Sequence, residues 1–345
     1  MELLGLGIEL LVLFVGFGFM VGVFFGFFGM GGSFLVTPAL LIIGYPAPVA
    51  IGSSMAFVFG TAVIATLKHH DIGQVDYKLG GLMFAGIVVG IEAGKAAVFA
   101  LEEIGQAELI VGSTYVVLLA AVGLLFVRSA LNQSTTDDSE GSGVGKDEED
   151  IPEVAKKIKS YNIPPMVTLT DGSRASMWTI SGVGGGVGVV SGFLGVGGGF
   201  LRMPAIYYLI GIPLTAAVGT SLFGALMSGG VGAFTYGLSG VIDIGVVTAL
   251  LVGSSLGARI GSASTAYVAE EDVTIYFGIM LLLASTAVLF GELATWLSMP
   301  ILDIVSFVLL IGSSLFVTVV IFYYGIRAIR AGSVSPPDDL ESDIS

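Results

Sequence analysis

The sequence has no cysteine, only two histidines and few charged residues. The absence of cysteine excludes disulfide bonds, a thiol nucleophile and thiolate metal ligands. With two histidines the apolar stretches contain no His/Glu cluster of the kind that holds a catalytic metal, so we expect no metal and no other cofactor. A G-x-x-x-x-G-K-[ST] segment is also missing, which argues against ATP hydrolysis through a P-loop. These absences favour a protein that is not an enzyme.

Charged residues make up 12% of the 345 positions, whereas soluble domains contain roughly 25%. Hydrophobic residues account for 54% and the mean hydropathy is +0.96. The net charge of −14 comes largely from polar segments, because nine of 27 acidic residues lie in 132–176 and four more follow Arg330. We therefore expect a multi-pass protein of the cell membrane, in contact with membrane lipids and with no nucleic-acid partner.

Nearly uncharged stretches predict the membrane-spanning helices. Two of these stretches, 3–45 and 175–210, are too long for one straight helix, and glycine-rich breaks interrupt them at 29–32 and 195–199. The other expected spans are 49–67, 79–100, 107–127, 215–236, 244–265, 273–291 and 302–326.

The expected fold class is all-α, with two homologous halves. We expect a first transmembrane repeat (1–130), an acidic and largely disordered cytoplasmic linker (131–174), a second repeat with one extra span (175–330) and an acidic tail (331–345). Lys and Arg near the span ends place the linker in the cytoplasm. The loop between Lys68 and Lys78 is basic, whereas its counterpart between Tyr236 and Asp243 has no basic residue, so we expect inverted repeats with glycine-broken helices.

A repeated glycine-rich motif reveals the duplication. Residues 26–39 read GFFGMGGSFLVTPA and residues 192–205 read GFLGVGGGFLRMPA, with nine of fourteen positions identical. The Gly-Tyr-Pro and Gly-Ser-Ser elements at 44–46 and 52–54 return as Gly-Ile-Pro and Gly-Thr-Ser at 211–213 and 219–221. Such a duplicated membrane chain with broken helices is typical of secondary transporters, whose binding sites lie between the repeats.

The two glycine breaks are the candidate anion site. Helices that restart after a break present free N–H groups and a positive dipole end, which favour an anion where water is scarce. Arg202, three residues beyond the second break, has a guanidinium that could clamp an oxyanion, and paired hydroxyls could donate to substrate oxygens. The predicted substrate-binding residues are Gly29, Gly31, Gly32, Ser33, Ser53, Ser54, Gly195, Gly197, Gly198, Gly199, Arg202, Thr220 and Ser221.

Each of these assignments has a structural alternative. The glycines could serve only close helix packing, the hydroxyls could bond back to helix carbonyls, and Arg202 could be an anchor at the membrane interface. Two other sets of glycines recur every fourth residue and predict close helix packing without substrate contact. They are Gly86, Gly90 and Gly94 in the first half and Gly253, Gly257 and Gly261 in the second.

Three charged residues lie inside the expected spans, where ionisable groups are costly. Glu92 and Lys95 are three positions apart on one helix, and Arg259 occupies the position in the second half that corresponds to Glu92. We expect a structural ion-pair group in which Glu92 pairs locally with Lys95 and with Arg259 across the two halves. The alternative is that these side chains extend to the membrane surface.

The paired segments GFFGMGGSFLVTPAL and GFLGVGGGFLRMPAI, with the elements that follow them, resemble the TauE/SafE sulfite exporter family. The resemblance extends from about Gly22 to Gly261 and includes both halves. It implies transport of small anions, often sulfur-containing, either inorganic or organic. The expected function is therefore a secondary transporter with a small anionic substrate; an anion channel and a membrane-embedded accessory subunit are the alternatives.

Overall fold

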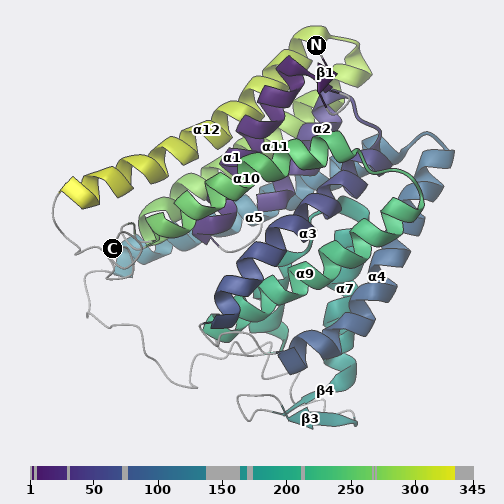
Figure 1. The fold of residues 1–345 in the computed structure, drawn as a ribbon, viewed down its shortest axis with the longest axis vertical. Helices are drawn as coiled ribbons and strands as arrows, with labels where there is room; N and C mark the ends of the chain where they lie inside the picture. Colours follow the sequence, from purple (N-terminus) through teal and green to yellow (C-terminus); the bar gives the residue numbers. More distant parts are fainter. Residues whose placement is uncertain are drawn as a thin grey trace.

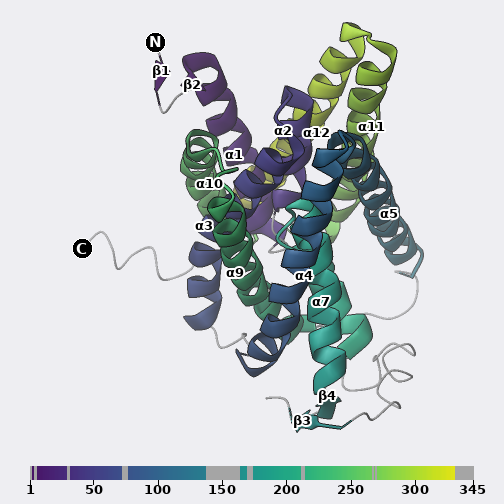
Figure 2. The ribbon, with the colours of Figure 1, turned by 90° about the vertical axis from the view of Figure 1, so that its right-hand side faces the viewer.

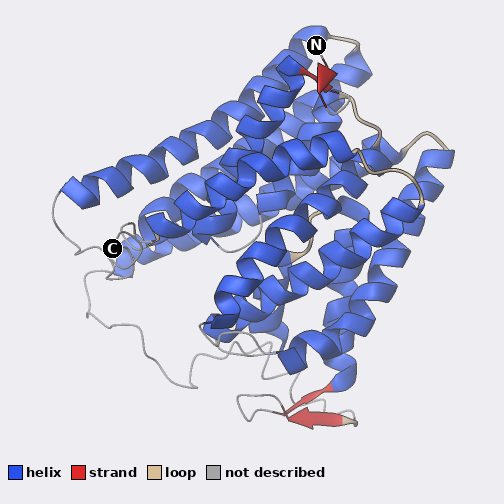
Figure 3. Ribbon diagram, in the orientation of Figure 1, coloured by secondary structure: helices blue, strands red, loops and turns tan. Residues whose placement is uncertain are grey.

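The protein is built almost entirely from helices in the part of the chain that the structure describes (Figure 3). The computed structural model describes residues 2–3, 6–28, 32–71, 77–136, 164–168, 174–210, 214–265, 268 and 270–330. Within these ranges two short antiparallel strand pairs occur, β1 (Glu2–Leu3) with β2 (Leu6–Gly7) and β3 (Met166–Thr168) with β4 (Arg174–Ser176). The expected all-α class is confirmed.

The helices follow the expected spans closely. The first half contains α1 (Ile8–Phe28), the 3-10 turn η1 (Gly32–Leu35), α2 (Val36–Ile43), α3 (Ala47–Asp71), α4 (Tyr77–Glu103) and α5 (Ala107–Thr136). The second half contains α7 (Met177–Leu194), α8 (Gly199–Ala205), the π-helical turn η3 (Ile206–Ile210), α9 (Leu214–Leu238), α10 (Ile244–Ser264), α11 (Glu270–Leu297) and α12 (Pro300–Arg330). Seven helices of the described chain are long and apolar enough to cross a membrane, which agrees with a multi-pass membrane protein.

The range expected to be a linker has more structure at its ends than hydropathy indicates. Helix α5 continues to Thr136, and thus into the polar residues at the start of the expected linker. The β3–β4 hairpin occupies the other end, and the ammonium of Lys78 at the start of α4 donates to the carbonyl of Thr168. Residues 137–163 of the expected linker and the expected tail, 331–345, lie outside the described residues.

The two halves interlock, because each packs its first helix against the fourth helix of the other. Helix α1 lies along α10 and α7 lies along α4, while α3 and α9 pack against each other between these pairs (Figures 1 and 2). Helices α5 and α11 also pack together across the halves, and α12 covers α11.

Glycines bring the backbones of these interlocking helices into contact. The faces of α1 and α7 carry Gly18, Gly22, Gly26 and, 166 positions later, Gly184, Gly188, Gly192. They meet Leu250, Ser254 and Ala258 of α10 and, at the corresponding positions of α4, Met83, Ile87 and Ile91. The predicted close packing of Gly86, Gly90 and Gly94 occurs against α7, and that of Gly253, Gly257 and Gly261 occurs against α1. Equivalent residues of the two halves therefore make equivalent contacts.

The two copies begin at opposite ends of the molecule. Helix α1, which follows β2, starts at the top of Figures 1 and 2, whereas α7, which follows β4, starts at the bottom. An inverted repeat requires such an arrangement. The orientation of each copy across the membrane stays a prediction.

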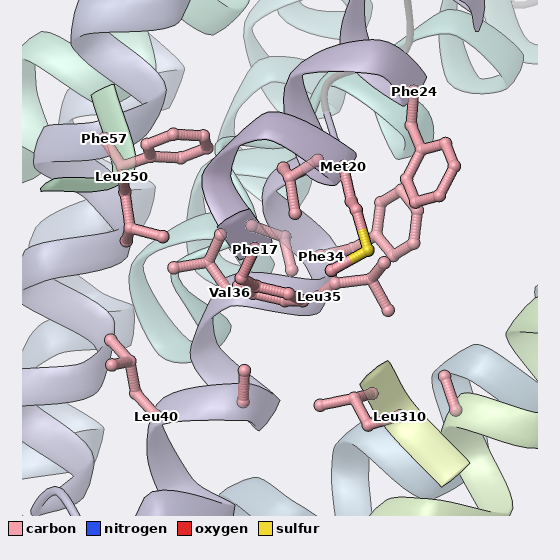
Figure 4. Packing of buried hydrophobic residues seen from close by; sticks show 14 of the residues in the cluster. Phe17, Met20, Phe24, Phe34, Leu35, Val36, Leu40, Phe57, Leu250 and Leu310 are labelled. Atoms are coloured by element: carbon pink, nitrogen blue, oxygen red, sulfur yellow. The ribbon is translucent and has the colours of Figure 1, made fainter. Parts of the chain in front are cut away.

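The largest hydrophobic cluster surrounds η1 and the start of α2. Figure 4 shows Phe17 and Met20 of α1 packed against Phe34 and Leu35, and the ring of Phe277 of α11 lies 5.8 Å from that of Phe34. All five side chains are buried. Because these contacts come from both halves, they fix η1 at the boundary between the copies, and Ser33 with it.

Gly22→Ala should destabilise the protein, because the new Cβ would lie 2.5 Å from the carbonyl oxygen of Ser254 and 2.6 Å from its Cα. Helices α1 and α10 would have to separate, and overpacking of this kind costs about 1–3 kcal/mol. Gly16→Ala on the same helix is the control, since no atom lies within 4 Å of its added Cβ. Thermal unfolding in detergent should show a lower Tm for Gly22→Ala alone, and equal Tm values would contradict the close crossing.

Candidate functional site

The chain breaks its helix between α7 and α8, in the interior of the protein. Helix α7 ends at Leu194, and Gly195, Gly197 and Gly198 then adopt φ values of +74°, +63° and +72°. Glycine tolerates this left-handed region, whereas residues with a Cβ rarely adopt it. All of the residues from Gly195 to Gly199 are buried. The glycine-rich sequence is therefore a requirement of the backbone at this place.

Two tyrosines bind carbonyls at the end of α7. The hydroxyl of Tyr236 on α9 donates to the carbonyl of Gly192 at 2.7 Å, and the hydroxyl of Tyr115 on α5 donates to that of Leu194. The last carbonyls of a helix have no partner within the helix, and leaving them unpaired away from water is costly. The tyrosines therefore stabilise the end of α7 from two neighbouring helices.

Two serines of the first half bind the carbonyls of the break itself. Ser33 of η1 donates to Val196 at 2.7 Å, and Ser54 of α3 donates to Gly195 at 2.9 Å and to the carbonyl of Ser33 at 3.5 Å. Ser33 follows the first glycine break, so the described edge of that break touches the second one. Of the predicted glycines in the first break, Gly32 opens η1, while Gly29 and Gly31 lie outside the described residues.

The remaining predicted hydroxyls also lie in buried positions. Ser221 of α9 donates to the carbonyl of Gly199 at 2.8 Å, the same relation that Ser54 has to Ser33 in the first copy. Thr220 is fully buried. The hydroxyls of Ser33, Ser54 and Ser221 thus donate to backbone carbonyls of other segments rather than back to their own helices, and their contact with substrate stays a prediction.

Ser53 connects α3 to the start of α10. Its Oγ accepts a hydrogen bond from the backbone N–H of Asp243 at 3.0 Å, and the carboxylate of Asp243 caps α10 by accepting from the N–H of Val246 at 3.1 Å. Burial, with a contribution from the nearby Asp243 carboxylate, raises the pKa of Tyr45 in the turn between α2 and α3. Ser53 therefore links α3 of the first half to α10 of the second half, and its contact with substrate stays a prediction.

Arg202 is completely buried, and its hydrogen-bond partners in the described part of the chain are all uncharged. Its Nη1 donates to the carbonyl of Ser221 at 3.1 Å, and its Nη2 donates to the hydroxyl of Ser228 at 3.1 Å and to the carbonyl of Gly197 at 3.4 Å. Its Nε has no hydrogen-bond partner among the described residues. With 0% of its surface exposed, Arg202 is not an anchor at the membrane interface, so that alternative is wrong.

Helix α9 packs directly against the guanidinium of Arg202 and holds it in place. Gly224 of α9 lies against it, and a Cβ at this glycine would come within 2.7 Å of Nε and 2.9 Å of Cζ. Ser228, one helical turn further, also donates to the carbonyl of Gly197 at 2.5 Å. Arg202, Ser221 and Ser228 therefore link α8, α9 and the break. A guanidinium removed from water without a counter-charge is expensive, and such residues within membrane proteins are functional candidates by default.

Comparisons with known proteins agree with the resemblance of the paired motifs. The family model described as sulfite exporter TauE/SafE matches residues 14–288. The chain belongs to the TauE/SafE sulfite exporter family. A probable membrane transporter protein of Xylella fastidiosa (strain 9a5c) is 27% identical over 258 residues, which cover 74% of this chain and 85% of that relative. The probable membrane transporter protein YunE of Bacillus subtilis (strain 168) is 24% identical over 281 residues, 79% of this chain and 94% of YunE. No solved structure matches the chain.

Family and fold together identify a multi-pass membrane transporter. The TauE/SafE match extends from α1 into α11 and thus includes both halves of the duplication. Both relatives are named probable membrane transporter proteins, and the seven apolar helices of this chain agree with such a protein. The family that the sequence motifs predicted is confirmed.

The expected buried ion pair of this TauE/SafE protein is wrong. Glu92 and Arg259 are both exposed, on α4 and α10, and these helices use their glycine faces to pack against α7 and α1. Each charged residue lies two positions from a packed glycine, which is about 200° around an α-helix and so on the opposite face. Lys95 is half-buried and donates to the carbonyl of Thr235 at 2.6 Å.

Four polar residues of the site were missed by reasoning from the sequence. Tyr115, Tyr236 and Ser228 donate to carbonyls of α7 and the break, while Ser191 lies on the last turn of α7. No motif marks them. The sequence indicates only that a tyrosine hydroxyl in an apolar helix needs a hydrogen-bond partner. It does not indicate which residue that partner is.

Tyr115→Phe should lower the stability of the protein, because it leaves the buried carbonyl of Leu194 without its donor. An unpaired buried acceptor costs about 1–3 kcal/mol. Tyr323→Phe is the matched control, since Tyr323 is 61% exposed on α12. The melting temperature of each purified variant in detergent measures the effect. Identical melting temperatures for the two variants would show that the end of α7 does not depend on this hydroxyl.

Proposed function

We propose that this TauE/SafE protein is a secondary transporter that moves a small anion across the cell membrane. The substrate class is a sulfur-containing or organic oxyanion, and Arg202 is the side chain that binds it. One observation carries the proposal. A fully buried guanidinium lies at the helix break between the two halves, and all of its partners are neutral oxygens.

The lack of an acidic partner for Arg202 among the described residues supports an anionic ligand. Hydrogen bonds from carbonyls and hydroxyls satisfy N–H groups but leave the positive charge of Arg202 uncompensated. An oxyanion would supply the opposite charge and accept from Nε, the nitrogen without a partner. The planar guanidinium also matches the oxygen spacing of carboxylates and related oxyanions. The charge and the free donor thus favour the same class of ligand.

The position of Arg202 at the boundary between the halves supports a role of this site in transport. The break receives donors from η1 and α3 of the first half and from α9 of the second, so a movement of one half against the other would change the surroundings of the guanidinium. In transporters with internal repeats the substrate site lies at this kind of boundary. The predicted glycines Gly195, Gly197, Gly198 and Gly199 shape the break, and serine hydroxyls of η1, α3 and α9 donate to its carbonyls.

Proteoliposomes test the function directly. Uptake and efflux of sulfite, sulfate, thiosulfate, methanesulfonate and small carboxylates should be measured with imposed pH and sodium gradients. A secondary transporter accumulates its anion against a concentration gradient when the correct ion gradient is applied. Conductive flux that only dissipates the anion gradient would identify a channel instead, and no flux of any of these anions would contradict the proposal.

Arg202→Lys should weaken transport although it keeps the positive charge. An ammonium cannot reproduce the planar set of donors, and we expect kcat/KM to fall about tenfold, equivalent to about 1.4 kcal/mol. Arg259→Lys is the matched control, because Arg259 is exposed on α10. Size-exclusion profiles and melting temperatures establish that both variants are folded. A folded Arg202→Lys protein with the kinetics of the wild type would exclude Arg202 from the binding site.

A further inference from the structure

The hydroxyl of Ser191 is buried and has no hydrogen-bond partner in the described part of the chain. Ser191 lies on the last turn of α7, where its backbone carbonyl accepts from the N–H of Gly195 at 2.7 Å. A serine within a helix commonly donates back to a carbonyl of its own helix. Ser264 and Ser314 do so at 2.9 and 2.8 Å. Among the described residues, Ser191 and Thr37 have the buried hydroxyls without a hydrogen-bond partner.

Ser191 and Arg202 contact the same face of one glycine. A Cβ added to Gly198 would lie 2.5 Å from Oγ of Ser191 and 3.1 Å from Nη2 of Arg202. The left-handed backbone at Gly198, with φ of +72°, turns the chain so that α7 and α8 present these two side chains to each other. The hydroxyl of Ser191 is unpaired, and so is Nε of Arg202, which belongs to the same guanidinium but lies against Gly224 of α9.

The equivalent positions of the first half carry no such pair of donors. The residues that correspond to Ser191 and Arg202, 166 positions earlier, are Phe25 and Val36. Both are buried hydrophobic residues, and Figure 4 shows Val36 beside Leu35 and Phe17. The duplication therefore left hydrophobic packing in one copy and a polar, charged arrangement in the other.

We propose that Ser191 and Arg202 form a single oxyanion subsite that belongs to the second copy alone. This inference rests on the proposed function and names the substrate class of that site. The hydroxyl of Ser191 donates to one oxygen of the anion, and Nε of Arg202 donates to another. Two separate donors select an anion with several oxygens on one centre, such as a sulfonate or sulfate, over a halide of equal charge. The chain therefore binds one anion at this boundary.

Ser191→Ala tests the subsite in proteoliposomes. Loss of a hydrogen bond to a charged ligand should raise KM for the transported oxyanion about tenfold. Chloride should compete better in the variant than in the wild type. Ser314→Ala is the matched control, because Ser314 is also fully buried but bonds to its own helix, and its transport should not change. The melting temperature of Ser191→Ala should not fall, because the removed hydroxyl has no protein partner.

Ser191→Cys gives a measurement that does not depend on transport, because the chain contains no other cysteine. Sulfate or methanesulfonate should slow the reaction of this thiol with N-ethylmaleimide, whereas chloride at the same ionic strength should not. Adding Arg202→Lys should weaken the protection. Equal labelling rates in all three anions would overturn the subsite, as would an unchanged KM for Ser191→Ala.

These outcomes separate the subsite from the proposed function. If the wild type transports an oxyanion and Arg202→Lys weakens that transport, the function stands whatever Ser191→Ala does. An unchanged KM for Ser191→Ala then rejects the role of Ser191 alone. Absence of anion transport by the wild type would reject the function itself.

Discussion

The carbonyl groups released where α7 ends are the constraint on which the rest of the site depends. Backbone polar groups away from water need partners, and irregular backbone at membrane depth is tolerated only where protein or a water-filled cavity provides them. Side chains from η1, α3, α5, α8 and α9 supply the donors, so both halves of the molecule are needed to hold the break. The carbonyls of Gly192, Leu194, Gly195, Val196, Gly197 and Gly199 each accept from such a side chain.

The glycines make that arrangement possible in two ways. Along α1 and α7 they let backbones touch the fourth helix of the other half, which interlocks the copies around the break. At the break they permit the left-handed backbone that separates the end of α7 from the start of α8. The two copies then differ at their centres. The first copy fills its centre with hydrophobic side chains such as Val36, whereas the second places Arg202 at the equivalent position, so the buried guanidinium belongs to one copy.

Much of the fold could be predicted because its determinants are local. Uncharged runs define spans, recurring glycines define close crossings, and the repeated motif defines the break and Arg202. The predicted pair of Glu92 and Arg259 failed because equivalence in a repeat does not say which face of a helix a residue occupies. The helical period relative to Gly90 and Gly257 would have placed both side chains outward. Tyr115 and Ser191 could not have been assigned, because their roles depend on which distant segments fold against α7.

The central claim is that an oxyanion binds beside the break at Arg202, and anomalous diffraction from crystals grown with selenate tests it most directly. Selenate has the shape and charge of sulfate, and selenium can be located without reference to a model of the ligand. The account predicts a selenium peak next to Gly198, within hydrogen-bonding distance of the guanidinium of Arg202 and the hydroxyl of Ser191. Selenium peaks only at other places, with Arg202 still bonded solely to the oxygens of Ser221, Ser228 and Gly197, would contradict it.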